Sequence, residues 1–325
     1  MNSFFGCKEF KSIEIPENSM LRSIGKCAFS NSSIEKVLIP KSVNSIEERA
    51  FSNCEHLKSV EFSIYSNLLS IVKGGFVGTS LENISIPPSV KFIEERAFFN
   101  CKKLFLVEIP KNSKLQLIDK DSFSGTSLVY ILITSKVNKI GERAFSDCNH
   151  LKLVEFSENS ELCSIDKDAF SKTFLEKIII PSSVRQIGEG AFFDCKKLRI
   201  VEFSEVSQLL SIDKDAFSGT LIEKILIPSS VSQIGERAFS YCENLHLVEF
   251  TMNSNLISIG KFAFSSTSLS NIIIPKSVNQ IGERAFSYCL SLKNIEILSE
   301  NVELGNFISD NCEEIFLVSF PNILM

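Results

Sequence analysis

Short apolar segments recur along the whole chain, with apolar residues at alternate positions and a polar or charged residue often between them. One form is Leu-x-x-Val-Glu-Phe, and the other is Leu-x-x-Ile-x-Ile followed by Pro. A period of two predicts strands with one buried face, and Pro ends a strand because it has no N–H for the ladder. The expected strands lie near residues 13–15, 37–39, 60–62, 84–86, 107–109, 131–133, 154–156, 178–180, 201–203, 225–227, 248–250, 272–274, 295–297 and 318–320.

These segments belong to a 47-residue repeat that never slips. Its cysteines are Cys7, Cys54, Cys101, Cys148, Cys195, Cys242 and Cys289. Each repeat has two related halves, because an inward Phe recurs at alternating intervals of 22 and 25 residues, as at Phe217, Phe239 and Phe264. We call the half with Cys-x-x-Leu-x-x-Val-Glu-Phe the A half. The half with Ala-Phe-Ser-x-Thr-x-Leu-x-x-Ile-x-Ile-Pro is the B half.

Self-similarity at a fixed period of about 20–50 residues is typical of stacked repeats. We therefore expect residues 1–325 to form a single solenoid of about 14 half-units, with 299–325 as a degenerate copy in which Ser319 replaces Glu. The segment before each Ala-Phe is too short for a full helix. The predicted fold class is an α/β repeat solenoid with a parallel sheet and short turns or single helical turns outside it. Phe4 and Cys7 already occupy repeat positions, which leaves the N-terminal end open to end-to-end contacts.

The inward positions predict a structural core. Stacking of the halves would align the Phe residues in a column, which accounts for 28 Phe in a chain without Trp. The Cys of A halves and the Thr of B halves would bond to backbone groups of the next rung. Cysteines two rungs apart would be about 9.5 Å apart and therefore unbridged. Cys289 and Cys312 are one rung apart, so their pairing stays open.

A column of charged residues alternates in sign from one half to the next, two positions before the repeated Ala. Its members are Lys26, Glu48, Lys73, Glu95, Lys120, Glu142, Lys167, Glu189, Lys214, Glu236, Lys261 and Glu283. Opposite charges on neighbouring rungs predict exposed ion pairs that set the order of A and B halves more than they add stability.

The outward strand positions form the candidate binding face, where Glu alternates with aliphatic residues and an earlier column mixes apolar side chains with Lys. Its candidate residues are Glu108, Tyr130, Leu132, Leu153, Glu155, Lys177, Ile179, Ile200, Glu202, Lys224, Leu226 and Glu249. Exposed apolar surface of this extent is typical of interaction sites. The alternative is that duplication has copied β-forming residues that bind nothing.

Composition and charge narrow the function. The net charge is −5 with no basic run, so nucleic acid and anionic membranes are not expected partners. No apolar stretch is long enough to insert in a membrane, and the N-terminus lacks the pattern of a signal peptide. His56, His150 and His246 occupy unrelated, variable positions, and a cysteine repeated seven times has no unique catalytic neighbourhood. We expect no enzyme, no metal and no cofactor.

From Ile180 to Leu198 the chain has the pattern Ile-Pro-x-Ser-Val-x-x-Ile-Gly-x-x-Ala-Phe-x-x-Cys-x-x-Leu. This pattern, with related copies over essentially the whole chain, resembles the BspA-like, or Treponema-type, leucine-rich repeat family. The resemblance implies a curved right-handed solenoid with its parallel sheet on the concave side. It also implies a surface protein linked to adhesion and host-protein binding, although the chain shows no signal peptide or anchor.

These observations favour a non-enzymatic binding scaffold, like a surface antigen or adhesin, that engages a protein or extracellular matrix partner through the concave sheet face. The alternative is a recognition arm or fragment of a larger intracellular or signalling protein. The family resemblance favours the cell surface or extracellular space, whereas the residues themselves carry no address.

Overall fold

The structure is a computed structural model that describes residues 3–312 and, for the backbone alone, 317–319. It is a parallel β-solenoid whose coils each contain a longer strand, a two-residue strand and a turn segment that carries the inward Phe. The chain divides into two compact units, Met1–Leu162 and Cys163–Met325, which are described separately. The expectation of one unbroken solenoid over residues 1–325 stays a prediction.

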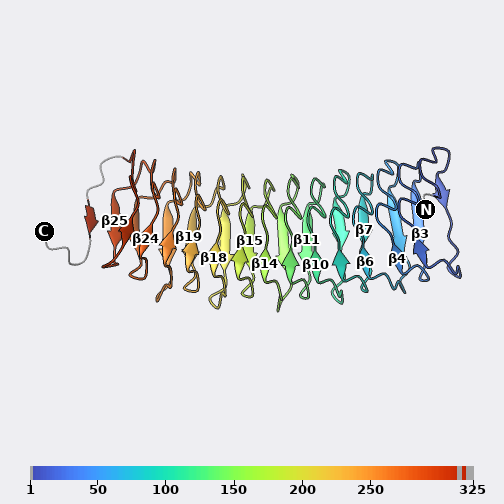
Figure 1. Ribbon diagram of the computed structural model, residues 1–325, viewed down its shortest axis with the longest axis horizontal. Coiled ribbons are helices and arrows are strands. Elements are labelled where there is room, and N and C mark those ends of the chain that lie inside the picture. Colours follow the sequence, from blue (N-terminus) through green and yellow to red (C-terminus); the bar gives the residue numbers. More distant parts are fainter. Residues whose placement is uncertain (1–2, 313–316, 320–325) are drawn as a thin grey trace. The chain divides into compact units, whose positions relative to one another are not determined.

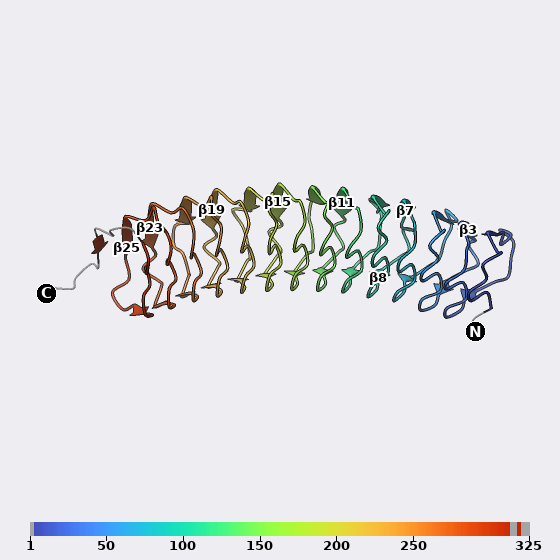
Figure 2. The same cartoon turned by 90° about the horizontal axis from the view of Figure 1, so that it is seen from above.

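From β3 onward the odd-numbered strands have three or four residues, whereas β1 and all even-numbered strands have two (Figures 1 and 2). Unit 1 contains β1 (Ser12–Ile13), β2 (Ser23–Ile24), β3 (Lys36–Ile39), β4 (Ser45–Ile46), β5 (Ser59–Phe62), β6 (Ser70–Ile71), β7 (Asn83–Ser85), β8 (Phe92–Ile93), β9 (Leu106–Glu108), β10 (Leu117–Ile118), β11 (Tyr130–Ile133), β12 (Lys139–Ile140) and β13 (Leu153–Phe156).

Unit 2 repeats the same order of elements. It contains β14 (Ser164–Ile165), β15 (Lys177–Ile180), β16 (Gln186–Ile187), β17 (Ile200–Phe203), β18 (Ser211–Ile212), β19 (Lys224–Ile227), β20 (Gln233–Ile234), β21 (Leu247–Phe250), β22 (Ser258–Ile259), β23 (Asn271–Ile274), β24 (Gln280–Ile281), β25 (Asn294–Ile297), β26 (Glu303–Leu304) and β27 (Leu317–Ser319).

Strand pairing is parallel, and in the long-strand sheets it joins each B half to the A half that follows. Thus β15 pairs with β17, and β19 pairs with β21. The short strands β14 to β26 pair in chain order along unit 2. At the C-terminal end Glu296 of β25 lies opposite Ser319 of β27. The remaining part of the degenerate copy, 313–316 and 320–325, lies outside the described residues.

The helical part of the predicted fold class is wrong, because the described residues contain no helix and the segments before the inward Phe are turns. The hydrogen bonds give the reason. The Ala216 amide donates to the Asp213 carbonyl three residues back, whereas the neighbouring Asp215 amide donates across to Glu236 on the next rung. Asp215 also has a φ of 55°, in the left-handed region. Amides that alternate between a local turn and the next rung cannot form the i to i−4 bonds of a helix.

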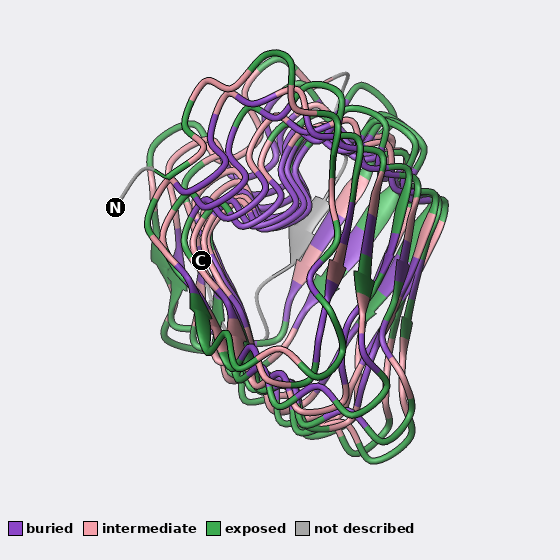
Figure 3. Cartoon of the chain, turned by 90° about the vertical axis from the view of Figure 1, so that its right-hand side faces the viewer, coloured by how far each residue is buried: buried purple, intermediate pink, exposed green. Residues whose placement is uncertain are grey.

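The Phe column is confirmed within each unit. Neighbouring rings are nearly parallel, with centroids 5.0–5.4 Å apart from Phe4 to Phe145 and 5.2–5.6 Å apart from Phe170 to Phe286. In Figure 3 the buried backbone, drawn in purple, lines the inside of the coils, and the exposed green segments lie at their corners. Stacked aromatic rings therefore lie in the centre of the core, and the strands face outward around it.

The expected inner polar column is present, but its bonds do not go to the next rung: the Cys thiols donate to the preceding rung, and the Thr173 hydroxyl donates to the Phe170 carbonyl of its own turn. The Cys242 thiol donates to the Phe217 carbonyl of the preceding rung at 3.2 Å, and its sulfur lies 3.2 Å from the Thr220 hydroxyl. The same pair of contacts recurs in other repeats of both units. Each A half is thereby bound to the B half before it, through a carbonyl that also accepts the backbone amide of Thr220.

Cys289 and Cys312 do not pair in this structure. All ten cysteines are free thiols. Cys289 donates to the Phe264 carbonyl at 3.1 Å, and Cys312 donates to the Phe286 carbonyl at 3.2 Å. The degenerate last copy thus keeps the same thiol-to-carbonyl bond as the regular repeats.

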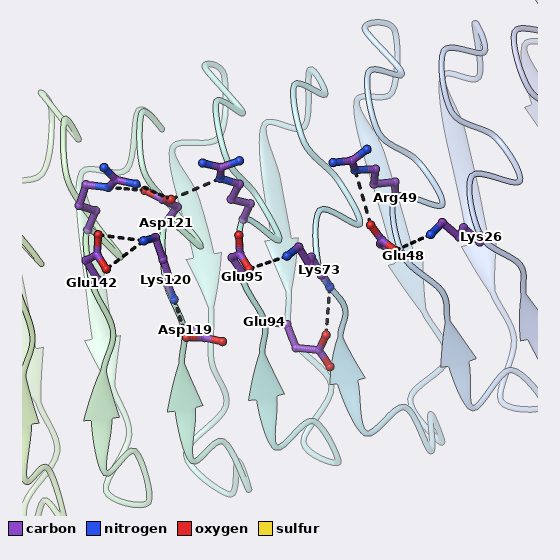
Figure 4. Close-up of polar contacts among 12 residues, drawn as sticks. Lys26, Glu48, Arg49, Lys73, Glu94, Glu95, Asp119, Lys120, Asp121 and Glu142 are labelled. Carbon is purple, nitrogen blue, oxygen red and sulfur yellow. Dashed lines mark hydrogen bonds and ion pairs between the residues drawn. The ribbon is translucent and has the colours of Figure 1, made fainter.

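The alternating charges form separate pairs, each joining a B-half Lys to the Glu of the next A half. The pairs are Lys26–Glu48 (2.7 Å), Lys73–Glu95 (2.7 Å), Lys120–Glu142 (2.9 Å), Lys167–Glu189 (3.1 Å) and Lys261–Glu283 (2.7 Å). Figure 4 shows the first three. The hydrogen bond from Lys261 lowers the pKa of Glu283. Because these pairs are exposed, each contributes little to stability, and their role in setting the order of halves stays a prediction.

One carboxylate beside this column is buried. The Asp121 side chain is only 2% exposed and accepts hydrogen bonds from Arg143 at 2.8 and 2.9 Å and from Arg96 at 3.3 Å. Asp121 therefore links the rung before it to the rung after it, as Figure 4 shows. A bidentate, charge-assisted bond to a buried carboxylate stabilises more than the exposed Lys–Glu pairs do.

We expect Phe192→Ala to lower the free energy of unfolding by about 3–5 kcal/mol, because a fully buried ring leaves a cavity in the column. The matched control is Phe193→Ala, whose side chain is 37% exposed and should cost well under about 1 kcal/mol. Urea unfolding followed by circular dichroism measures both. Equal losses for the two variants would contradict the central role of the column.

Candidate functional site

The structure places every candidate residue on a longer strand with its side chain outside the core. In unit 1, β9, β11 and β13 carry Glu108, Tyr130, Leu132, Leu153 and Glu155. In unit 2, β15, β17, β19 and β21 carry Lys177, Ile179, Ile200, Glu202, Lys224, Leu226 and Glu249. We call the outward side of the odd-numbered strands the long-strand face. The two sets lie in different units, and the structure brings together the members of each set.

The apolar members of the face are partly open to solvent. Ile179 is 54% exposed, Ile200 46% and Leu226 50%. Their strand neighbours Ile178, Val201 and Ile225 are buried, as the alternating pattern predicts. The face therefore exposes branched aliphatic side chains next to a rigid core.

Two of the predicted carboxylates are not free. In unit 1 the Tyr130 hydroxyl donates to Glu155 Oε2 at 2.8 Å. Burial of the phenol, followed by the hydrogen bond to Glu155 and the negative charge of that residue, raises the pKa of Tyr130 to about 12. In unit 2 Lys177 Nζ lies 2.7 Å from Glu202 Oε1. The sequence-based description treated these as separate columns and missed the diagonal contacts.

The geometry behind those contacts is the strand register. Lys177 lies opposite Ile200, and Ile179 lies opposite Glu202. A long side chain at the first position of a B strand therefore reaches diagonally to the Glu two positions further along the next strand, which is a common contact in sheets. Lys36 and Glu61 form the same contact at 2.7 Å in unit 1.

The long-strand sheet is interrupted at several steps from an A half to the next B half, although β9 and β11 do pair. Strands β17 and β19 are neighbours, yet they belong to separate two-stranded sheets. The Glu223 amide, just before β19, donates to the Arg199 carbonyl at 3.4 Å, and no strand pairing follows within the described part of the chain. The connection from β17 to β18 is also two residues longer than the connection from β19 to β20.

A recess of about 490 Å³ lies at this interruption. Five candidate residues line it, namely Ile200, Glu202, Lys224, Leu226 and Glu249, and Arg199, Val201, Phe203, Ser204, Glu205, Ser207, Ile225, Pro228, Ser229 and Thr251 complete the lining. The recess thus has aliphatic and aromatic walls with charges of both signs around it. Such walls suit an apolar side chain of a partner with polar groups beside it.

An equivalent recess of about 590 Å³ lies one 47-residue repeat further along, between β21 and β23, where Phe250, Thr251, Ile273 and Pro275 are among the lining residues. Sequence reasoning missed both recesses. The signal was present in the alternating Phe intervals of 22 and 25 residues, because the longer interval contains the longer connection after each A strand. Because the connections after A and B strands differ in length, a long strand does not meet the strand before it and the strand after it in the same way.

The buried ladder cysteines lack the features of an activated nucleophile. Burial raises the pKa of Cys101, Cys148, Cys195 and Cys242 to about 11 in each case. A thiol must ionise to act as a nucleophile, and burial without a cationic neighbour opposes ionisation. Among the described residues no group of His, Cys, Asp and Glu could hold a metal ion, and no helix is long and apolar enough to cross a membrane.

A parallel solenoid with Leu, Ile and Phe columns and an outward strand face defines a leucine-rich repeat protein. The chain belongs to the family described as the BspA type leucine rich repeat region (6 copies), whose model matches residues 1–105, 69–199, 116–246, 163–289 and 243–325. The resemblance inferred from the repeat is therefore confirmed. No match is found among curated proteins.

Solved structures support the fold. A leucine-rich repeat protein from Bacteroides ovatus is 26% identical over 90% of this chain and 80% of its own, with a TM-score of 0.67. A leucine rich cell surface protein from Faecalibacterium prausnitzii is 26% identical over 85% of this chain and 83% of its own, with a TM-score of 0.41. The pneumococcal vaccine antigen PcpA is 22% identical over 78% and 73%, with a TM-score of 0.49. The first likeness supports the fold, and the other two superpose too loosely to support an argument.

At pH 8 we expect the exposed Cys163 to react rapidly with a disulfide reagent, and the buried Cys195 to react only after unfolding. A pKa of about 11 leaves roughly one thiol in a thousand ionised at that pH. Counting released thiolate before and after denaturant measures the difference. Cys163→Ser should remove a rapid phase that Cys195→Ser leaves intact, and rapid native reaction of Cys195 would contradict the burial.

Proposed function

We propose that this chain is a non-enzymatic scaffold that binds a protein partner through the long-strand face of unit 2. The observation that carries the proposal is the recess between β17 and β19, which gathers five residues of the predicted face around an apolar wall. Protein interfaces place their affinity in pockets of this kind and use the charged rim for orientation. A protein of the extracellular matrix is the partner class that the proposal names.

The surroundings of the recess suit an extended segment. Ile200 and Leu226 lie on neighbouring strands and are about half exposed, so both sides of the recess present aliphatic surface. Lys224 and Glu249 stand on adjacent strands at its edge. An apolar partner side chain would enter between the strands, and flanking charges of both signs would pair with the rim.

Rigidity supports the same function. The walls of the recess belong to strands that cover the stacked Phe column, so the groups that would contact a partner are already ordered. A preordered surface loses less conformational entropy when it binds. A partner would therefore meet a face that needs no rearrangement of the backbone.

A role as a surface antigen or adhesin is the finer part of this proposal and rests on family analogy. We expect antibodies against the chain to label intact, unpermeabilised cells that express it. Labelling that appears only after permeabilisation would contradict a surface role and would leave the binding scaffold untouched.

We expect the double variant Ile200→Asp/Leu226→Asp to weaken binding to an extracellular matrix protein by more than about tenfold, because two carboxylates would stand in the apolar wall. Surface plasmon resonance against a panel of purified matrix proteins measures this. The matched control is Phe174→Asp/Phe193→Asp, which changes two apolar side chains of similar exposure outside the recess lining.

Both variants should keep the circular dichroism spectrum and melting temperature close to those of the parent, because all four positions are partly exposed. Binding that survives the face variant, or that falls equally in the control, would show that the recess does not carry the interaction.

A further inference from the structure

A second surface of unit 2, separate from the long-strand face, carries two unexplained tyrosines. The residue three positions after the inward Ala of each half adopts a left-handed conformation along the described chain. In other A halves it is Asn53, Asn100, Asp147 or Asp194, whose short polar side chains tolerate that conformation. At Tyr241 and Tyr288 it is an aromatic residue, with φ of 58° and 57°. The left-handed conformation does not favour an aromatic residue, so the backbone does not explain why Tyr occupies these two positions.

Both tyrosines project to solvent, with Tyr241 61% and Tyr288 53% exposed. Their spacing is set by the backbone ladder. The Tyr241 amide donates to the Ser265 carbonyl, and the Ser266 amide, one rung on, donates to the Ser287 carbonyl, each at 2.9 Å. Since equivalent residues on successive rungs are tied in this way, the two tyrosines stand on the same edge exactly two rungs apart.

The rung between them carries a small residue. Ser266 occupies the equivalent position, so the strip along this edge is aromatic, small and aromatic in turn. The inward rings under the three rungs follow at 5.3 and 5.6 Å, which sets the step along the strip. The backbone positions of the two tyrosines are therefore two rungs apart, with Ser266 on the rung between them.

A recess of about 330 Å³ opens beside Ser266 and Tyr288, and Tyr241 is not part of its lining. It is lined by Glu243, Ser266, Thr267, Ser268, Tyr288, Leu290 and Ser291. Serine hydroxyls can both donate and accept hydrogen bonds, and the Glu243 carboxylate accepts them. The lining has no cation, which disfavours an anionic ligand at this place.

We propose that Tyr241, Tyr288 and the recess beside Tyr288 bind a neutral, extended oligosaccharide. A pyranose ring presents an apolar face of C–H groups and a rim of hydroxyls. The apolar face suits the ring of a tyrosine, and the rim suits serine hydroxyls and a carboxylate. An extended chain of several sugars can stack on both tyrosines while its middle part faces Ser266, Ser268 and Ser291.

This site stands apart from the partner-binding function proposed above, because its residues lie on the turn side of the coil and do not line the recess between β17 and β19. It also differs in chemistry. The long-strand recess offers aliphatic walls with charges of both signs, whereas the tyrosine strip offers two aromatic rings with hydroxyls. The two sites can therefore be tested separately.

Intrinsic fluorescence provides a direct measurement, because the chain has four Tyr and no Trp. In a Tyr65→Phe/Tyr130→Phe background, Tyr241 and Tyr288 are the only tyrosines that contribute to the tyrosine fluorescence. The probes are the hexasaccharides of cellulose, chitin, xylan, mannan and laminarin, titrated separately and checked by calorimetry. We expect at least one of them to change the tyrosine emission in a saturable way, with disaccharides binding about tenfold more weakly because they reach a single ring.

The decisive variant is Tyr241→Asn/Tyr288→Asn, made in the natural background and measured by calorimetry. It installs the residue that Asn53 and Asn100 already provide at equivalent positions, so the fold should be at least as stable. Binding should fall more than about tenfold, whereas Tyr241→Phe/Tyr288→Phe should retain it within about threefold, because the ring faces remain. The matched control is Tyr65→Ala, a 69% exposed tyrosine of unit 1.

Three outcomes would overturn the proposal. They are no saturable response to any of the five sugars, full binding by the Asn variant, and an equal loss in the Tyr65→Ala control. Loss of matrix-protein binding in the Asn variant, without sugar binding by the parent, would likewise replace the oligosaccharide by a protein ligand. Failure of this site would leave the Ile200/Leu226 test of the proposed function unaffected.

Discussion

The fixed step between rungs is the constraint on which the rest of the structure depends. In unit 2 the inward Phe rings follow one another at 5.2–5.6 Å, close to the spacing of hydrogen-bonded strands. Because rings and backbone share one step, each half can bury its aromatic residue only against its neighbours. The Cys-to-carbonyl bonds and the Lys–Glu pairs join neighbouring rungs at the same step. They therefore favour the alternating order of A and B halves, whereas the step itself comes from the backbone and the rings.

The alternation of A and B halves has a structural effect beyond the sequence repeat. The A half has a longer connection after its strand, so strand pairing runs from a B half to the next A half and stops before the following B half in most repeats. The recesses beside β17 and β21 occur at these stops. A repeat protein built from identical halves would have a continuous sheet and a flatter face. The unequal halves thus turn a regular scaffold into a surface with places to bind.

Much of this fold could be predicted from the chain. The strand positions, the Phe column, the free buried thiols and the outward position of Ile179 and Leu226 all follow from periodicity, because equivalent residues of a stacked repeat have equivalent surroundings. Periodicity could not decide whether the segment before each inward Phe forms a helical turn. A short segment such as Asp213–Phe217 suits a turn or a helix equally well, and inter-rung hydrogen bonds decide between them. The diagonal contacts from Tyr130 to Glu155 and from Lys177 to Glu202 were also missed, since they join columns that the repeat lists separately.

The sequence by itself determined which side chains face the core and which repeat partners share a column, because a period of two fixes the facing of a strand and a period of 47 fixes the equivalence of residues. Only the tertiary structure decided which residue of a neighbouring rung each side chain contacts and how far apart the two rungs lie. Lys261 could meet a Glu on either side, and it pairs with Glu283 on the following rung. The reason is physical, since the gap between two rungs depends on the lengths of two connections at once, and a single half contains only one of them.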